Sequence, residues 1–163
     1  MMAYRVCGLE SMRRFGAHVA SVLQSGDTLF LAGALGAGKT TLAQCIIRVL
    51  CGEDVEVTSP TFTLQHPYDL PAGGTLMHMD MYRIEDAAEL DMLGLDEMIG
   101  MHLCLIEWPE KLAHHTPNDY VALHLVVARD GARLVQLSSA GRGALLQEKL
   151  NDAIIASGEY RVA

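Results

Sequence analysis

The stretch from Gly33 to Thr40 (GALGAGKT) is the feature that most restricts how this chain can fold. It matches the pattern G-x-x-x-x-G-K-[ST] of a phosphate-binding loop, which lies between a strand and a helix. An apolar run at 28–32 precedes it, as expected for a buried parallel strand, and a run with helical character at 41–50 follows it. The pattern therefore predicts an α/β fold in which a strand enters this loop and a helix leaves it.

Each residue type in the loop has a chemical task. Glycines let the backbone curl so that successive N–H groups point at phosphate oxygens, and the following helix N-terminus adds its dipole. Lys39 supplies a mobile positive charge for the β- and γ-phosphates. Thr40 offers a hydroxyl to a magnesium ion. By itself, the loop predicts binding of a nucleoside triphosphate.

Length and composition limit the class of protein. The 163 residues are half apolar, with 15 glycines and no repeat or linker, which favours one domain spanning 1–163. The net charge of −8 argues against tight non-specific binding to nucleic acid, because that needs a basic face. The longest apolar stretches, about ten residues, are too short to span a membrane.

The N-terminus lacks the apolar region and cleavage site of a signal peptide, so we expect a cytoplasmic protein. The cysteines show no C-x-x-C spacing, and two of them lie in apolar runs. We therefore interpret them as reduced core residues and not as disulfides or metal ligands. These cysteines are Cys7, Cys45, Cys51 and Cys104.

Hydrophobic periodicity and turn residues predict the remaining elements. Helices are expected at 9–24, 41–50 and 141–156, with a partly helical acidic segment at 85–100 and a short helix after Trp108. Strands are expected at 28–32, 55–57, 62–68, 75–80, 102–107, 120–127 and 133–138. The acidic segment is most simply a solvated surface, and a surface that faces a partner protein is the alternative.

Two of the predicted strands end in a carboxylate, Asp80 and Glu107. Ligands of open α/β sheets bind outside the carboxyl ends of parallel strands, so both acids lie near the phosphates if both strands are parallel to 28–32. One acid would then bind magnesium while the other orients water, and the sequence leaves open which does which. The hydroxyl-rich loop at 58–63 is equally consistent with an ordinary turn and with a contact to the γ-phosphate.

His114 and His115 are the other residues that suggest metal binding. Neighbouring residues on a loop point in different directions, and no third ligand has a suitable spacing in the sequence. The pattern therefore argues against a metal site there.

Three classes of phosphate-loop protein share such a loop. A GTPase needs an N-K-x-D segment to read guanine, which this sequence lacks. A small-molecule kinase needs an arginine-bearing lid, and the arginines do not cluster in such a stretch. An ATPase that acts as a switch within a complex is compatible with the small size and acidic charge. A kinase, and a nucleotide-dependent adaptor with incidental hydrolysis, remain the alternatives.

Several segments occur in the order found in one family. They are 35–41 (LGAGKTT), 59–64 (SPTFTL), 78–83 (HMDMYR), 93–95 (LGL) and 106–109 (IEWP). Over nearly its whole length the chain resembles TsaE, the small P-loop ATPase family of bacterial tRNA threonylcarbamoyladenosine (t6A) synthesis. Ala34 stands where the family commonly has Asp, and Ser11 stands where a threonine is usual.

The resemblance implies a three-layer P-loop NTPase fold with a mixed, mainly parallel sheet between helices. It implies a protein that binds ATP and magnesium and hydrolyses ATP slowly by itself. The expected partners are TsaD and TsaB, which transfer the threonylcarbamoyl group to adenosine 37 of tRNAs that read ANN codons. The tRNA would be reached only through these partners, and this chain would not perform the transfer.

The resemblance also implies roles for individual residues, carried over by position. Thr40 and Glu107 would bind magnesium, and Asp80, at the Walker B-like position, would order magnesium or water. Thr61 would sense the γ-phosphate as a switch, and Trp108 would change environment with nucleotide or partner. Ser11 and Arg133 would lie near the base or ribose. The residues expected to cradle the phosphates are Gly36, Ala37, Gly38, Lys39, Thr40 and Thr41, with Lys39 on the β- and γ-phosphates.

Overall fold

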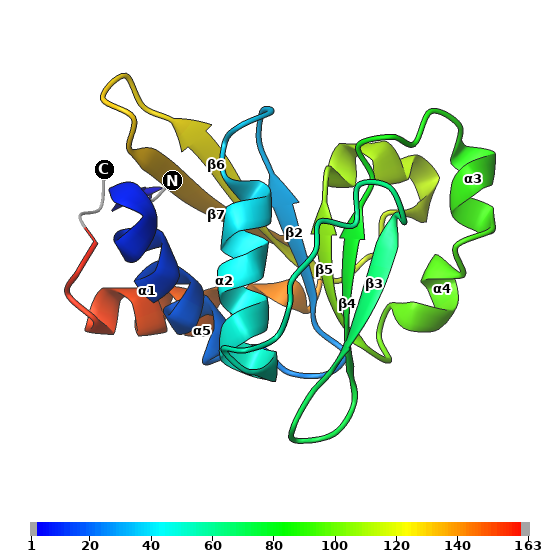
Figure 1. Ribbon diagram of the computed structural model, residues 1–163, viewed down its shortest axis with the longest axis horizontal. Helices are drawn as coiled ribbons and strands as arrows, with labels where there is room; N and C mark the ends of the chain where they lie inside the picture. Colours follow the sequence, from blue (N-terminus) through cyan, green and yellow to red (C-terminus); the bar gives the residue numbers. More distant parts are fainter. Residues whose placement is uncertain (1–2, 161–163) are drawn as a thin grey trace.

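Seven strands form one mixed sheet at the centre of the protein, in the order β1-β7-β6-β2-β5-β4-β3 (Figure 1). The computed structural model describes residues 3–160. The strands are β1 (Ala3–Val6), β2 (Thr28–Ala32), β3 (Gln65–Asp69), β4 (Thr75–Asp80), β5 (Leu103–Glu107), β6 (Tyr120–Val127) and β7 (Arg133–Ala140). The helices are α1 (Gly8–Ala20), α2 (Lys39–Cys51), α3 (Ala87–Asp91), α4 (Leu95–Met98) and α5 (Gly143–Ala156), with a 3₁₀ segment η1 (Pro109–His115).

The centre of the sheet is parallel and its margins are antiparallel. Strands β4, β5, β2 and β6 run in the same direction, whereas β3, β7 and β1 pair antiparallel with their neighbours. Strand β2 lies between β5 and β6 with all five of its residues buried, as a strand covered on both faces requires. The carboxyl ends of the four parallel strands therefore meet at one edge, which is where ligands bind in such sheets.

Helices cover both faces of the sheet, which gives three layers. On one face α1, α2 and α5 bury a core that includes Phe15, Ile46 and Leu150. On the other face α3, α4 and η1 pack against β4 and β5 around Met79 and Ile106. In Figure 1, α1 and α2 lie side by side, and α3 and α4 lie at the opposite end of the molecule. The α/β class and the flanking helices predicted from the sequence are confirmed.

Local boundaries differ from the sequence predictions in several places. Strand β1 was not predicted, and the expected strand at 55–57 is irregular. The first helix ends at Ala20 and not at residue 24. The acidic segment at 85–100 divides into α3 and α4 because Gly94 adopts a left-handed conformation with φ of 67°.

The cysteines are only partly as predicted. All four are free thiols, and Cys45 and Cys104 are buried, but Cys51 is half-buried and Cys7 is exposed. Cys7 is therefore not a core residue, because it lies between β1 and α1 at the surface. In the described part of the chain, 3–160, no helix combines the length and apolar character needed to cross a bilayer.

Candidate functional site

The segment from Gly33 to Thr40, here called the glycine loop, leaves β2 and enters α2 at the carboxyl edge of the sheet. Gly33 has φ of 141°, and a Cβ there would lie 2.4 Å from the carbonyl oxygen of Leu125 on β6. Gly38 is the N-cap of α2 in a left-handed conformation with φ of 105°. Only glycine adopts these conformations without strain, so the glycines at both positions serve the curl of the loop.

Lys39, the first residue of α2, points back into this curl. Its ammonium donates hydrogen bonds to the carbonyls of Gly33 (2.7 Å) and Ala34 (3.0 Å) and lies 3.7 Å from the centroid of the Trp108 ring. The side chain is buried, and this burial lowers the pKa of Lys39, while the carboxylates of Glu107, Glu110 and Asp80 act in the opposite sense. The ammonium is therefore a partly desolvated cation held where an anion can approach.

Glu107, the last residue of β5, connects the start of α2 to β4. Its Oε2 accepts a hydrogen bond of 2.8 Å from the hydroxyl of Thr40, and its Oε1 lies 2.9 Å from Nε2 of His78. Glu107 and His78 are 1% and 0% exposed, so their interaction is almost fully shielded from water. Burial of a carboxylate is costly unless it is paired, and this contact with His78 provides the partner. Glu107 is thus fixed with one oxygen toward Thr40.

Asp80, the last residue of β4, lies beside Glu107 because the two are paired in the β4–β5 register. Its Oδ2 accepts a hydrogen bond of 2.9 Å from the hydroxyl of Thr61, and its Oδ1 accepts one of 2.9 Å from the backbone N–H of Tyr82. The Thr61 hydroxyl also lies 2.7 Å from that of Ser59. The loop at 58–63 therefore contacts one of the two strand-end acids.

These groups line one cavity of about 330 Å³. The glycine loop and the start of α2 form one side, while the ends of β4 and β5 form the other. The cavity is lined by Leu35, Gly36, Gly38, Lys39, Thr40, Thr41, Thr61, Asp80, Tyr82, Glu107, Trp108 and Arg133. The structure thus brings together most of the site residues predicted from the sequence.

Ser11, Ala37 and Arg133 are the remaining residues that the sequence predicted to contact the nucleotide. Arg133 donates from Nε to the carbonyl of Ala37 (3.3 Å) and lines both this cavity and a neighbouring one of about 240 Å³. Ala37 is buried, and its N–H donates to the carbonyl of Ala34 (3.1 Å). In the described chain Ser11 lines neither cavity, although its α1 neighbours Leu9 and Met12 line the smaller one.

The chemistry of the donors suits a phosphate and a hard cation. Curled backbone, the N-terminus of α2 and a buried ammonium all favour a multiply charged anion. A hydroxyl on Thr40 with the carboxylates of Glu107 and Asp80 offers the oxygen ligands that magnesium prefers. Thr40 and Glu107 are already joined by a hydrogen bond, so their oxygens converge on one side of the cavity.

The sequence predicted no role for His78, which is buried behind the cavity and contacts Glu107. The spacing could have indicated its position: His78 and Asp80 are two residues apart on β4, so their side chains face the same side of the sheet. Tyr82 was also missed; its ring centroid lies 4.9 Å from that of Trp108. The position of Trp108 depends on a left-handed backbone, with φ of 57°, which spacing alone does not predict.

Comparisons with known proteins agree with this architecture. A sequence model of the family described as "Threonylcarbamoyl adenosine biosynthesis protein TsaE" matches residues 7–135. The TsaE protein of Bacillus subtilis is 35% identical over 155 residues, which covers 92% of this chain and 94% of the relative. That of Rickettsia bellii is 35% identical over 130 residues, which covers 80% and 90%.

A solved structure shows the same arrangement of elements. The crystal structure of YdiB from Bacillus subtilis matches with a TM-score of 0.74 and 30% identity, over 93% of this chain and 96% of that chain. The glycine loop, both strand-end acids and the Thr61 loop all lie within the residues that the family model matches. The family model, the sequence identity to curated relatives and the structural match each extend over most of the chain, and they show that this chain belongs to the TsaE family.

Proposed function

We propose that this protein is a magnesium-dependent ATPase that serves t6A biosynthesis as a nucleotide-controlled subunit, working with TsaD and TsaB partners. The family membership and the names of its relatives, which are t6A biosynthesis proteins, support the pathway. The cavity beside the glycine loop supports the ATPase activity. The weak intrinsic turnover expected from the resemblance belongs to this proposal, as does the absence of transferase activity in the chain itself.

One observation carries the proposal: two hydrogen-bonded pairs converge on the same cavity. Thr40 donates to Glu107 on one side, and Thr61 donates to Asp80 on the other. Because β4 and β5 pair in parallel with Asp80 opposite Glu107, the two acids cannot be separated without disrupting the sheet. A nucleotide in this cavity would meet a fixed acid from each strand.

ATP binding would redistribute the hydrogen bonds of Lys39. Its ammonium now donates to two loop carbonyls, which carry only partial negative charge. The β- and γ-phosphates would offer it full negative charges in a partly desolvated setting, where charge-assisted hydrogen bonds are strongest. Gly36, Gly38, Thr40 and Thr41 would direct backbone N–H groups at the same phosphates, and Arg133 would lie toward the nucleoside.

Thr40, Glu107 and Asp80 are the residues that would hold magnesium. The ion would supply charge neutralisation at the β- and γ-phosphates. The protein oxygens that coordinate the ion must stay in place while ATP reacts. The contact of His78 with Glu107 keeps that carboxylate oriented. We assign His78 as a positioning residue for Glu107.

Hydrolysis needs a water molecule aligned with the γ-phosphorus. The water oxygen forms the new bond to phosphorus, the bond to the bridging β–γ oxygen breaks, and ADP and phosphate leave. Asp80 is the buried carboxylate suited to orient that water and accept its proton, because the hydroxyl bonded to its Oδ2 belongs to the Thr61 loop and could turn to the nucleotide, which would free that oxygen. Glu107 already engages both of its oxygens, with Thr40 and His78.

Thr61 would report the presence of the γ-phosphate. Its hydroxyl now donates to Asp80, and a γ-phosphate oxygen would compete for the same proton. Transfer of that hydrogen bond would free Oδ2 of Asp80 for water and would pull the loop at 58–63 toward the nucleotide. Binding energy for ATP over ADP would therefore be coupled to the position of this loop.

The surroundings of the cavity suit a partner protein. Leu35 and Tyr82 line the cavity and are 76% and 46% exposed, and Phe62, which follows the cavity residue Thr61 in the chain, is 84% exposed. Exposed apolar side chains clustered at one site indicate protein contact. A net charge of −8 disfavours direct capture of tRNA, so the partners would present it. Sub-micromolar binding of tRNA by the isolated protein at physiological salt would contradict this arrangement.

The test is reconstitution with the TsaD and TsaB partners, with ATP or a non-hydrolysable analogue. We expect t6A formation and release of free phosphate with ATP, and loss of sustained t6A formation with the analogue. A phosphorylated small molecule in place of free phosphate would show a kinase. Full t6A formation without hydrolysis, together with partner affinity that depends on nucleotide, would show an adaptor.

A further inference from the structure

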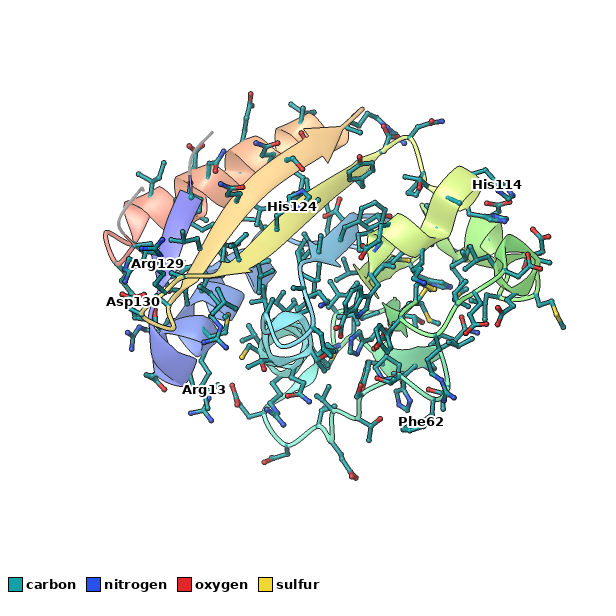
Figure 2. The ribbon with its side chains drawn as sticks, turned by 90° about the horizontal axis from the view of Figure 1, so that it is seen from above. Arg13, Phe62, His114, His124, Arg129 and Asp130 are labelled. Atoms are coloured by element: carbon teal, nitrogen blue, oxygen red, sulfur yellow. The ribbon has the colours of Figure 1, made fainter. Side chains whose placement is uncertain are left out.

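A second cluster of ligand-forming side chains lies where α3 meets η1. Asp91 is the last residue of α3, and His114 and His115 are the last two residues of η1. One ligand atom from each of the three lies within 4.8 Å of the others. Figure 2 shows His114 at the opposite end of the molecule from Arg129 and Asp130. None of the three side chains lines the cavity beside the glycine loop.

The environment of His115 indicates a missing partner. Its Nε2 lies 3.0 Å from Oδ1 of Asp91, and its side chain is 11% exposed. Across residues 3–160, however, this buried nitrogen has no hydrogen-bond partner, because the geometry of that contact is unsuitable. Buried polar atoms are normally satisfied. An imidazole nitrogen and a carboxylate oxygen that face each other in this way are placed as two ligands of a shared cation.

The rings of the two histidines lie close together next to a kink in the backbone of η1, at Ala113. Ala113 has φ of 49° and ψ of −119°, a conformation that a residue with a Cβ rarely adopts. The ring centroids of His114 and His115 are 4.2 Å apart, with 37° between their planes. The sequence pattern predicted that the two histidines point apart and offered no third ligand; the kink at Ala113 and the position of Asp91 correct both expectations. Backbone strain of this kind persists at ligand sites, where the gain in binding offsets it.

Asp91 has an electrostatic reason to accept a cation. It lies at the C-terminal end of α3, where the helix dipole disfavours a carboxylate, and the last turn of α3 contains no basic residue. The lysine of η1, Lys111, donates instead to the carbonyl of Ile84 at 3.1 Å. A bound dication would supply the positive charge that this helix end lacks.

We propose that Asp91, His114 and His115 form a binding site for a divalent transition-metal ion of the Zn²⁺ class. Imidazole nitrogen donors select Zn²⁺, Ni²⁺, Co²⁺ and Cu²⁺ over Mg²⁺, which prefers oxygen. Two histidines and one carboxylate make a three-ligand set that leaves a coordination position for water. The ion joins α3 to η1, a segment that begins directly after Trp108. This site is independent of the proposed ATPase activity.

Metal titration of the full-length protein tests the proposal. The protein is freed of metal with a chelator and titrated with Zn²⁺ by calorimetry in millimolar Mg²⁺, which occupies oxygen-rich sites. Co²⁺ in a parallel titration reports nitrogen ligation through its visible absorption bands. The variants Asp91→Asn, His114→Gln and His115→Gln each remove one ligand. The matched controls are His102→Gln and Asp96→Asn, a histidine and an exposed carboxylate outside the cluster.

We expect the wild-type protein to bind Zn²⁺ and each ligand variant to bind it at least tenfold more weakly, with both controls within twofold of wild type. Zn²⁺ also raises the thermal unfolding midpoint of the wild type and controls, and this shift disappears in the ligand variants. Absence of Zn²⁺ binding by the wild type overturns the proposal. So does unchanged affinity in all three ligand variants, which would place the ion elsewhere, for example at the exposed thiol of Cys7.

Discussion

The ammonium of Lys39 lies 3.7 Å from the centroid of the Trp108 ring while it donates to the carbonyls of Gly33 and Ala34. The cation thus has three neutral partners, and the face of the indole is one of them. A cation over an aromatic face gains about 0.5–2 kcal/mol, whereas a phosphate offers full charges. Anion binding at the glycine loop must therefore alter the contact between Lys39 and Trp108.

Trp108 is the one tryptophan of the chain, so its fluorescence reports this contact. We expect addition of Mg-ATP to change the emission intensity or wavelength of the wild-type protein in a saturable manner. The change arises because the ammonium moves from the indole face toward the phosphates. Fluorescence titration measures it directly.

Lys39→Ala provides the control for this signal. It removes the cation, so we expect a different initial emission and at least a tenfold loss of apparent ATP affinity. An identical saturable change in Lys39→Ala would contradict the assignment of Lys39 to the phosphates.

Glu107→Gln tests the acid at the end of β5. The amide keeps the size of the side chain but removes the charge that faces Thr40 and His78. We expect the ATP turnover rate to fall by more than tenfold, because removal of a preorganised electrostatic group costs at least this much. Glu97→Gln, an exposed carboxylate in α4, should stay within twofold of wild type. Normal turnover of Glu107→Gln in the assembled complex would remove Glu107 from the mechanism.

Thr61→Ala tests the proposed sensing of the γ-phosphate. Loss of the hydroxyl leaves Oδ2 of Asp80 without its partner in either nucleotide state. We expect the preference of the protein for ATP over ADP, measured by competition binding, to fall at least fivefold. Thr63→Ala, at an exposed position of the same loop, should keep the wild-type preference. An unchanged ratio in Thr61→Ala would show that the loop does not distinguish the two nucleotides.

The central strands and their loop were predictable because their signals are local. The apolar run before Gly33 predicted a buried strand, and the acids Asp80 and Glu107 were predicted at the ends of two further strands. In the structure both acids lie at the same edge of the sheet. Strand β1 was missed because its four residues are stabilised by pairing with β7, at the far end of the chain. The acidic segment at 85–100 is partly helical, as predicted, but its division into two short helices depends on the left-handed backbone of Gly94, the N-cap of α4.

Side-chain pairing across strands was harder to predict than the strands themselves. His78 and Glu107 are 29 residues apart, and their 2.9 Å contact depends on the β4–β5 register, which no local pattern specifies. The positions of Trp108 and His114 depend on left-handed backbone at Trp108 and Ala113. Such conformations are rare for residues with a Cβ and are set by tertiary packing, so sequence spacing gave no indication of them.

Cys104 and Cys7 should differ sharply in reactivity with thiol reagents. Burial in the core raises the pKa of the Cys104 thiol well above its ordinary value, to about 12. The reactive thiolate is then scarce at pH 8, and its fraction grows as the pH rises toward 12. We expect iodoacetamide at pH 8 to label Cys7, which is exposed, and to leave Cys104 unlabelled in the folded protein.

Mass spectrometry of the labelled peptides distinguishes the two cysteines. Labelling of Cys104 should appear when urea unfolds the protein, which controls for poor detection of its peptide. Equal labelling of both residues at pH 8 without denaturant would contradict the burial of Cys104.

Gly33→Ala tests whether the curl of the glycine loop rests on a missing side chain. A Cβ at this position would lie 2.4 Å from the carbonyl oxygen of Leu125, a backbone atom that cannot rotate away, and φ of 141° adds strain. We expect the free energy of unfolding to fall by about 3 kcal/mol or more, since overpacking and backbone strain add. Gly73→Ala is the matched control, because Gly73 also has a positive φ, 93°, but a Cβ there meets nothing within 4 Å. It should cost only about 1–2 kcal/mol, the penalty for left-handed backbone alone. Urea denaturation with a common m-value measures both, and equal losses in the two variants would show that close packing against β6 does not explain the glycine at residue 33.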